Sequence, residues 1–199
     1  VVEATGTYGD FTVGTSKGDR CQARRILISV GVADELPPVP GLRERWGRSV
    51  FHCPYCHGYE LGDGPIGVLA SSPASLHHAL MLPDWGRTTL FLNEAFEPDA
   101  AQSAQLAARG VHVEAEPVAG IVGDRADVEL RSGRVVPIAG LFSLTRTSPA
   151  SPLAEQLGCA LDEGPTGPFV RIDGVGQTSV PGVFAAGDAA RAMGSVALA

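Results

Sequence analysis

The sequence predicts an α/β fold, and three observations predict it. Between residues 66 and 144, apolar runs of strand length alternate with segments of helical composition, which is the order of a parallel α/β unit. Hydrophobic residues make up 44% of the chain and charged residues 19%, so a packed core is expected rather than disorder. A length of 199 residues is enough for one large domain or two modest ones.

The first forty residues are expected to form short strands followed by a Pro-rich stretch without helix or strand. Residues 10–13 alternate between polar and apolar, residues 16–19 indicate a turn, and residues 23–30 indicate a strand with an apolar end. The Pro-rich stretch 36–41 is incompatible with a helix or a central strand, because proline fixes φ and lacks an N–H. This stretch therefore predicts a crossover between domains.

The remaining elements follow from apolar runs and their flanking prolines and glycines. Pro73 is expected to open a helix, since proline is favoured in the first helical turn, and Gly110 to end another over 98–109. Strands are expected at 66–70, 88–92, 111–114, 127–130, 135–138, 140–144, 169–172 and 183–186, and a short helix at 153–157. Residues 127–130 and 135–138 are expected to pair as a hairpin.

Charge and hydropathy exclude several classes of partner. The formal net charge is -7 and the fifteen Lys and Arg residues form no basic run, which argues against nucleic acid. No apolar stretch approaches the roughly 18 residues that a membrane helix needs. Residues 1–4 lack the features of a signal peptide, so a cytoplasmic location is expected.

Cys53-Pro54-Tyr55-Cys56 is the main chemical motif. Two thiols separated by two residues can close a small disulfide, and Pro54 stiffens the loop between them. A neighbouring cation raises the thiolate fraction that attacks disulfides, and His52 and His57 flank the pair. A single Cys-x-x-Cys favours redox chemistry but is also compatible with half of a zinc site.

The zinc interpretation is the weaker one, because a closed structural site needs four ligands. Cys21 and Cys159 are isolated, and His77, His78 and His112 supply no second pair at ligand spacing. A glutaredoxin carries the same Cys-Pro-Tyr-Cys motif at the start of an amphipathic helix. Here the three glycines and one proline within 57–65 forbid a long helix, so this interpretation fails on context.

Two longer motifs resemble one known family. Residues 41–60, GLRERWGRSVFHCPYCHGYE, are similar to a bacterial branch of the thioredoxin reductase family, and residues 178–188, TSVPGVFAAGD, look like its C-terminal flavin motif. The resemblance implies two Rossmann-like, three-layer nucleotide-binding domains, one inserted in the other. Residues 1–41 would begin the flavin domain, 42–144 would form the inserted NAD(P)-type domain with the Cys pair, and 145–199 would return to the flavin domain.

The resemblance also assigns the redox residues. It implies that Cys56 faces the flavin, that Cys53 exchanges with the substrate, and that His57 stands where related reductases carry an acidic proton donor. It further implies that Cys53 and Cys56 lie close enough to form a disulfide, which requires Cα atoms within about 7 Å.

For the flavin, the resemblance implies contacts with FAD from Gly31, Gly187, Asp188 and Ala189. The strand–Gly-x-Gly-x-x-Gly–helix unit of about 30 residues that holds the FAD pyrophosphate is expected to precede Val1. The flavin domain is thus expected to be incomplete at its N-terminus and to end within a capping helix, so the 199 residues alone are expected to bind FAD weakly.

The nucleotide loop of the inserted domain departs from the family pattern. Its glycine positions fall on Ala70, Ser72 and Ser75, whose side chains obstruct close approach of a pyrophosphate. Ser71, Ser72 and Glu94 are the residues left to contact a nucleotide, and Glu94 would repel a 2′-phosphate. NADPH is therefore expected to bind poorly or not at all.

The sequence leaves three functions open. The first is an FAD-dependent, NAD(P)H-linked disulfide oxidoreductase like thioredoxin reductase, and the second is an oxygen-using oxidase of small dithiols, which needs no NADPH. The third is a remnant without catalysis. The expected partner is a thioredoxin-like protein or a small dithiol, and a homodimer is compatible with the family.

Several other residues are expected to be structural: Trp46 and Trp85 in packing, His77 and His78 as ordinary residues of a helix face, and Cys21 and Cys159 as inert, small apolar residues.

Overall fold

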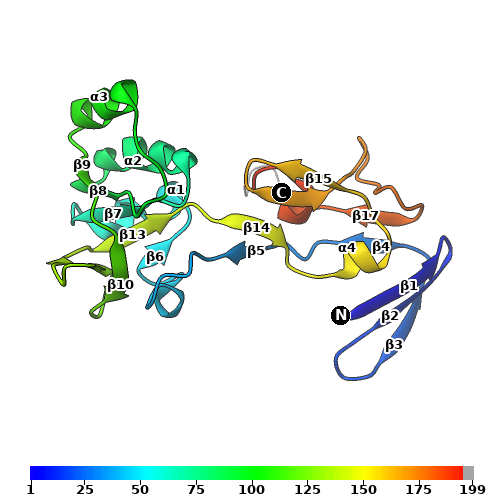
Figure 1. Cartoon of the computed structure of the whole chain (residues 1–199). Helices are drawn as coiled ribbons and strands as arrows, with labels where there is room; N and C mark the ends of the chain where they lie inside the picture. Colours follow the sequence, from blue (N-terminus) through cyan, green and yellow to red (C-terminus); the bar gives the residue numbers. More distant parts are fainter. Residues whose placement is uncertain (195–199) are drawn as a thin grey trace. The chain divides into compact units, whose positions relative to one another are not determined.

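The computed structural model describes residues 1–194 and divides into two compact units. The first unit combines Val1–Glu35 with the segment that starts at Arg146, and the second, inserted unit is Leu36–Thr145 (Figure 1). The Pro-rich stretch 36–41 belongs to the inserted unit, since the backbone N–H of Ile121 donates to the carbonyl of Pro40 at 2.8 Å. The parallel sheets described below confirm the α/β class.

The inserted unit is built on one parallel sheet. Its five strands lie in the order β6 (Val50–Phe51), β13 (Gly140–Ser143), β7 (Ile66–Leu69), β8 (Thr88–Phe91) and β9 (His112–Glu114). Every residue of β7 and β13 is buried. Such strands are typical of a parallel sheet that is covered on both faces.

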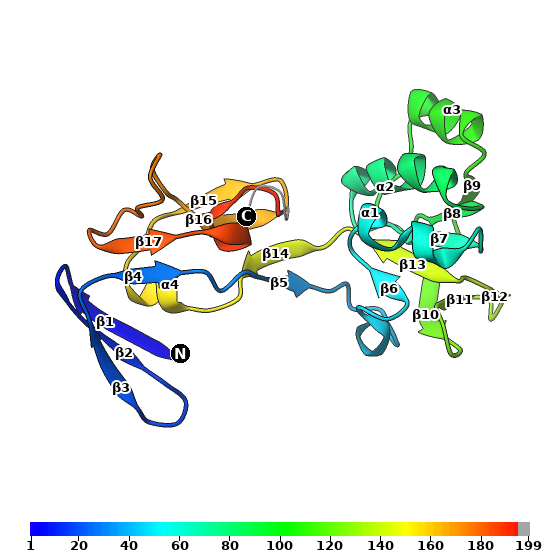
Figure 2. The same ribbon diagram turned by 180° about the vertical axis from the view of Figure 1, so that it is seen from behind.

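The two faces of this sheet are covered differently. Helices α2 (Leu76–Met81) and α3 (Ala100–Ala108) lie on one side, and the antiparallel sheet β10 (Val118–Val122), β11 (Asp127–Leu130) and β12 (Val135–Val136) lies on the other (Figures 1 and 2). Ile66 and Val68 belong to the core on the helix side, and Leu69 to the core on the other. This alternation along β7 produces three layers.

The predicted helix at 98–109 is confirmed as α3, and its start has a clear cause. The Asp99 carboxylate accepts from the backbone N–H of Gln102 at 2.8 Å, and the Gln102 side chain accepts from the Asp99 N–H at 3.0 Å. This reciprocal capping satisfies two N–H groups at the helix start. Gly110 follows the helix with φ +69°.

The first unit contains mostly short strand pairs. An antiparallel sheet joins β1 (Glu3–Thr7), β2 (Asp10–Gly14) and β3 (Arg20–Ala23); β4 (Ile26–Ile28) pairs in parallel with β17 (Val183–Ala185); β5 (Val32–Glu35) pairs with β14 (Arg146–Pro149), and β15 (Leu161–Gly164) with β16 (Gly167–Val170). Helix α4 spans Leu153–Gln156. The core of this unit centres on Phe11, Ile28 and Val183.

The sequence prediction differs from the structure at several elements. The strand expected over 23–30 is shorter, because β3 ends at Ala23 and only Ile26–Ile28 form β4. Pro73 opens a 3-10 turn, Pro73–Ser75, and α2 begins only after it. Strands β1, β5, β6, β10, β14 and β15 were not predicted. The C-terminal capping helix falls on residues outside the described range.

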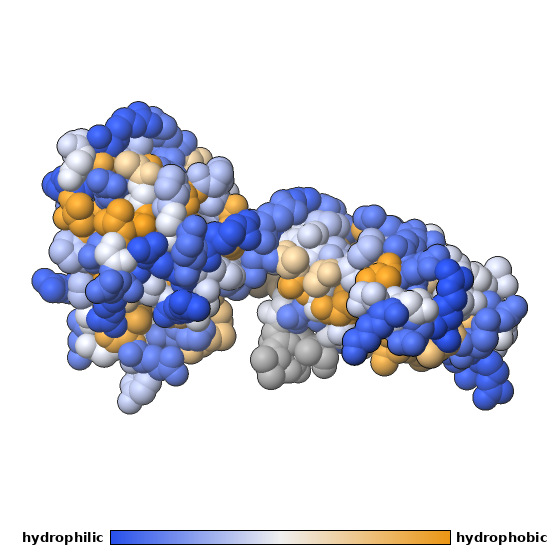
Figure 3. Space-filling view, turned by 90° about the horizontal axis from the view of Figure 1, so that it is seen from below, coloured by the Kyte–Doolittle hydropathy of each residue, from blue (hydrophilic) through white to orange (hydrophobic). Residues whose placement is uncertain are grey.

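The surface seen in Figure 3 carries hydrophobic patches bordered by hydrophilic residues on both units. Among residues 1–194, no helix is long and apolar enough to cross a membrane.

Candidate active site

The Cys motif lies at the carboxyl end of β6, where the chain turns into the short helix α1 (Pro54–His57). Cys53 is extended and precedes the helix, and Pro54 occupies the first helical turn. Cys53 and Cys56 form a disulfide with their Cα atoms 5.4 Å apart, so the expected proximity is confirmed. Cys56 is exposed and Cys53 is half-buried.

His57 is held between an aromatic ring and a carboxylate. Its ring stacks on Phe51, with centroids 4.2 Å apart and planes at 22°. Its Nδ1 lies 3.6 Å from Oε2 of Glu60, and both side chains remain accessible to solvent. The helix therefore presents an oriented imidazole directly after Cys56, where it can exchange protons with solvent and with a nearby thiol.

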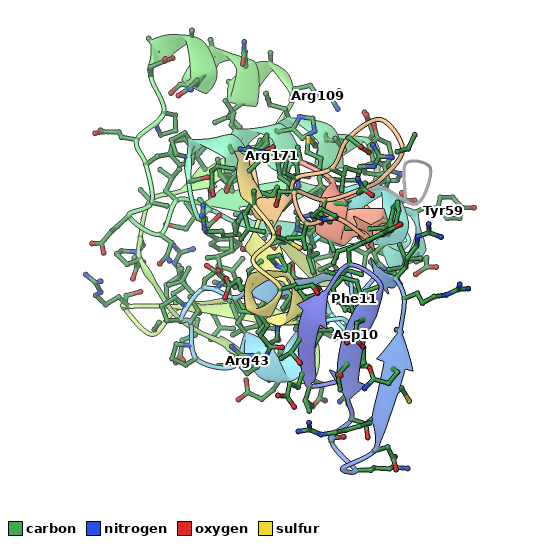
Figure 4. All side chains as sticks on the ribbon, turned by 90° about the vertical axis from the view of Figure 1, so that its right-hand side faces the viewer. Asp10, Phe11, Arg43, Tyr59, Arg109 and Arg171 are labelled. Carbon is green, nitrogen blue, oxygen red and sulfur yellow. A yellow bond between two sulfur atoms is a disulfide. The ribbon has the colours of Figure 1, made fainter. Side chains whose placement is uncertain are left out.

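A second aromatic group borders the disulfide. The Tyr55 ring meets the Trp85 ring edge-on, with centroids 5.6 Å apart. A Cβ on Gly58 would come within 2.8 Å of the Trp85 ring, so a glycine is needed at this position for Trp85 to pack against the motif. Tyr55 and Tyr59 are exposed, and Tyr59 projects away from the ribbon (Figure 4). Trp85 thus packs as expected, while the two tyrosines face solvent.

The residue directly before the motif, His52, lies beside a second histidine, His78. The rings of His52 and His78 are 6.2 Å apart at 78°. His52 Nδ1 lies 3.3 Å from the Thr145 hydroxyl. Burial lowers the pKa of His78 to about 4, and the charges of His52 and His77 add to this effect. The expectation that His78 is an ordinary residue of a helix face is therefore wrong, because α2 directs it into the unit.

The nucleotide loop follows β7, beside the point where the strand order reverses between β7 and β13. In α/β sheets, ligands bind at such a point, outside the carboxyl ends of the strands. Here the Ser71 hydroxyl donates to the carbonyl of Leu144, after β13, at 2.6 Å. The Ser71 N–H donates to the hydroxyl of the fully buried Ser75 at 3.1 Å. The N–H and the hydroxyl of Ser71 thus both have partners within the protein, and Ala70 and Ser72 flank Ser71 in this turn.

Glu94 lies past the end of β8, in a left-handed conformation with φ +60°. Its carboxylate is 3.4 Å from the Arg131 guanidinium, which the end of β11 brings to it. Both side chains are well exposed, so the pair adds little stability. Arg131 was not anticipated, since 37 positions separate it from Glu94.

The flavin residues lie at the carboxyl ends of the parallel strands β4 and β17. Gly31 follows β4 and Gly187 follows β17, with φ values of +70° and +69°. Nothing lies within 4 Å of the position that a Cβ would take at either glycine. Because parallel strands end at the same edge of a sheet, the two glycines leave open space at one edge for a flat ligand.

Asp188 and Ala189 continue this edge in a 3-10 turn over Gly187–Ala190. Asp188 is half-buried, and within residues 1–194 its carboxylate has no hydrogen-bond or ion-pair partner. A carboxylate in this position can accept a hydrogen bond from a ligand hydroxyl. Ala189 is fully buried and offers no exposed surface to a ligand. The residues present therefore fit a flavin at this edge, with Asp188 as the polar contact.

Of the two remaining cysteines, one matches the prediction of a buried, inert residue and one does not. Cys159 is buried and contacts the Thr178 hydroxyl, as expected of a small, inert residue. Cys21 is exposed on β3, so the expectation of an apolar role is wrong there. Among the described residues, no three His, Cys, Asp or Glu side chains gather as a metal site.

Comparison with known proteins shows the family to which the chain belongs. The model of the family described as pyridine nucleotide-disulphide oxidoreductase matches residues 1–199. The chain is 32% identical over 200 residues to thioredoxin reductase tcpT of Claviceps purpurea (strain 20.1), covering 94% of this chain and 62% of that protein. The chain thus spans about three-fifths of the length of the curated relatives it matches.

Two solved structures extend the likeness to the fold. An oxidoreductase from Agrobacterium tumefaciens is 54% identical with a TM-score of 0.92, covering all of this chain and 67% of its own. The protein HlmI is 38% identical with a TM-score of 0.82, covering 98% of this chain and 62% of its own. The match confirms the two-domain, Rossmann-like fold class.

Proposed function

Because this chain belongs to the pyridine nucleotide-disulphide oxidoreductase family, we propose that it is an FAD-dependent thiol–disulfide oxidoreductase whose redox centre is Cys53–Cys56. The disulfide at the start of α1, beside an oriented His57, is the observation that carries the proposal. Its sequence relatives among the thioredoxin reductases support the same class of reaction.

The chemistry follows from thiol–disulfide exchange. A substrate thiolate attacks the sulfur of Cys53, the Cys53–Cys56 bond breaks, and its electron pair stays on Cys56 as a thiolate. The second substrate thiolate then attacks the substrate sulfur of the mixed disulfide, which forms the substrate disulfide and releases Cys53 as a thiolate. His57, positioned by Phe51 and Glu60, holds or returns the proton that the Cys56 sulfur needs.

The open edge at Gly31 and Gly187 supports the flavin assignment, with Asp188 as its polar contact. When bound, FAD supplies an acceptor or donor of two electrons for the Cys pair. In the oxidising direction, one substrate dithiol loses two electrons and two protons as its disulfide forms.

The residues of the serine loop do not fit a dinucleotide. The Ser71 N–H is already bonded to Ser75 and the Ser71 hydroxyl to Leu144, so neither group is free to bind a pyrophosphate after β7. This observation favours, as a second candidate, an oxidase that transfers the two electrons of a small dithiol to oxygen, over a reductase that takes them from NADPH to a thioredoxin-like protein.

The two candidates predict different products in air. With the FAD-loaded protein and a small dithiol, the oxidase forms one hydrogen peroxide for each substrate disulfide. The reductase instead consumes NADPH when a thioredoxin-like protein disulfide is supplied. Thiol titration, peroxide assay and absorbance of NADPH measure the three quantities.

Substitution separates the Cys pair from other thiols. Cys53→Ser is expected to abolish turnover, by at least about a thousandfold, because exchange needs both sulfurs. Cys21→Ser, which removes an exposed thiol of the first unit, is expected to leave turnover unchanged. Equal turnover of Cys53→Ser and the parent protein would refute the assigned redox centre.

A further inference from the structure

The inserted unit contains a cavity of about 470 Å³ at the amino ends of its parallel strands. Pro65 precedes β7, Arg87 precedes β8 and His112 begins β9, and all three line the cavity. Val136, from β12, and Ile138, from the link to β13, form another part of its wall. The volume falls in the range of small-molecule sites, which is roughly 300–1,000 Å³.

The cavity lies at the opposite end of the strands from the redox motif. The Cys pair follows the carboxyl end of β6, the loop with Ser71 follows that of β7, and Glu94 lies past the end of β8. The residues of the cavity instead precede or begin their strands. The residues assigned to the proposed redox reaction therefore leave this cavity without a function.

The strand register places two polar side chains side by side in the cavity. Thr89 and His112 are Cα partners in the parallel pairing of β8 with β9. Phe91, two residues after Thr89, belongs to the core on the side of the antiparallel sheet, so Thr89 faces the same side. Val136 of β12 packs against that core from the antiparallel sheet. The cavity therefore lies at the corner where the parallel sheet meets β12.

The polar side chains that matter in this cavity are hydrogen-bond donors. Arg87 offers a guanidinium, His112 a ring N–H and Thr89 a hydroxyl. Within residues 1–194, neither the Arg87 side chain nor the Thr89 hydroxyl has a hydrogen-bond or ion-pair partner. Among the same residues, no Asp or Glu lines the cavity. This combination is suited to a negatively charged group.

The carboxylates near the cavity are already bonded to other groups. Glu114, two residues after His112, forms an ion pair with Arg134. The Asp127 carboxylate accepts from the backbone N–H of Ile138 at 3.0 Å. An anionic group in the cavity therefore meets unpaired donors, and the nearby negative charges already have partners.

We propose that this cavity binds a small organic anion. Its carboxylate or phosphate group is held by Arg87, because a guanidinium donates two parallel hydrogen bonds to such oxygens, and Thr89 and His112 are further donors. Its apolar part lies against Pro65 and Val136. This ligand is not the thiol substrate, since the Cys pair lies at the other end of the strands.

Calorimetric titration with phenyl phosphate and with phenylacetate tests the site, because each probe joins an anionic group to an apolar ring. We expect the parent chain to bind at least one of them with a dissociation constant below about 1 mM, and the tighter probe identifies the preferred anionic group. Inorganic phosphate lacks the ring and benzyl alcohol lacks the charge. Each is expected to bind at least about tenfold more weakly than the tighter probe.

Variants locate the bound probe. Arg87→Gln is expected to raise the dissociation constant at least about tenfold, because it removes the charge and the paired donors. Arg43→Gln changes an exposed arginine of the same unit that is not part of the cavity wall, and it is expected to leave the constant unchanged. If thermal unfolding shows that Arg87→Gln does not fold, His112→Gln decides, with an expected rise of at least about threefold.

Two results would overturn the site. One is a dissociation constant above about 1 mM for both probes with the parent chain. The other is equal affinity of the parent chain and the deciding variant, which would place the probe elsewhere on the molecule. The titration involves neither FAD nor the Cys pair, so it stands or falls independently of the proposed redox function.

Discussion

Two edges of parallel strands in this molecule carry the residues expected to bind nucleotide cofactors, and they differ in what surrounds the backbone. At the ends of β4 and β17, Gly31 and Gly187 have positive φ values and empty space where a side chain would stand. At the ends of β7 and β13, Ser71 bonds across the edge to Leu144 and back to Ser75. The first, the open edge, has space for a ligand, whereas at the second, the closed edge, both the N–H and the hydroxyl of Ser71 are already bonded.

We propose that the difference is how this fold keeps one nucleotide site and loses another. A glycine turn leaves backbone N–H groups and space for a ligand, and both are needed to bind a pyrophosphate or a flavin. A serine in the same turn fills the space and offers its own hydroxyl as the partner of the N–H. The sheet is unaffected, because the strands are held by their ladders and their apolar cores. Loss of a site therefore requires no loss of fold.

The largest effect is expected in acid, where protonation of the buried His78 should destabilise the folded chain. His78 has a pKa of about 4 in the folded chain and 6.5 in its ordinary state. As pH falls below 6.5, the unfolded chain binds a proton that the folded chain refuses, so stability falls until about pH 4. The loss should reach about 3 kcal/mol.

Urea unfolding at pH 7 and pH 4 measures this loss. His78→Phe is expected to remove most of the acid-dependent difference, and His77→Gln, which changes the exposed neighbour, to keep most of it. If His78→Phe loses as much stability in acid as the parent chain, the explanation by a buried, neutral His78 is wrong.

A smaller effect is expected at the open edge. Gly187→Val places a branched side chain in the space beside β17, at a φ of +69° that such residues adopt with strain. The FAD dissociation constant, measured by fluorescence titration, is expected to rise at least about tenfold, which corresponds to about 1.4 kcal/mol. Gly174→Ala, at a glycine with open space and no positive φ, is the matched control. Unchanged FAD binding by Gly187→Val would remove the distinction between the two edges.

The sequence predicted the parts of this comparison that depend on local pattern. The apolar runs predicted β7, β8 and β13, and the Cys motif predicted its disulfide, because both signals lie within a few consecutive residues. Strands β5 and β14 were missed, since they are short, polar and paired across more than a hundred residues. Strand β10 was missed because Gly120 interrupts its apolar run, close to where its register with β11 is also irregular.

The interior of the site was less predictable than its motif. His77 and His78 are identical in type and adjacent in sequence, and only the packing of α2 decides that one is exposed and the other buried. The sequence showed that serines replace glycines in the nucleotide loop. It could not show that Ser71 reaches Leu144, 73 positions away, because that contact depends on β13 lying beside β7.

The most direct test of the open and the closed edge is anaerobic mixing of the FAD-loaded protein with NADPH, with NADH or with a small dithiol, while flavin absorbance is followed. We expect the dithiol to bleach the flavin, and oxygen to restore its colour. We expect NADPH at micromolar concentration to leave it oxidised, because losing the charge-assisted bonds of a pyrophosphate site weakens binding by at least about a hundredfold. Rapid bleaching by micromolar NADPH would contradict the claim that the edge at β7 and β13 binds NADPH poorly, and it would establish a reductase.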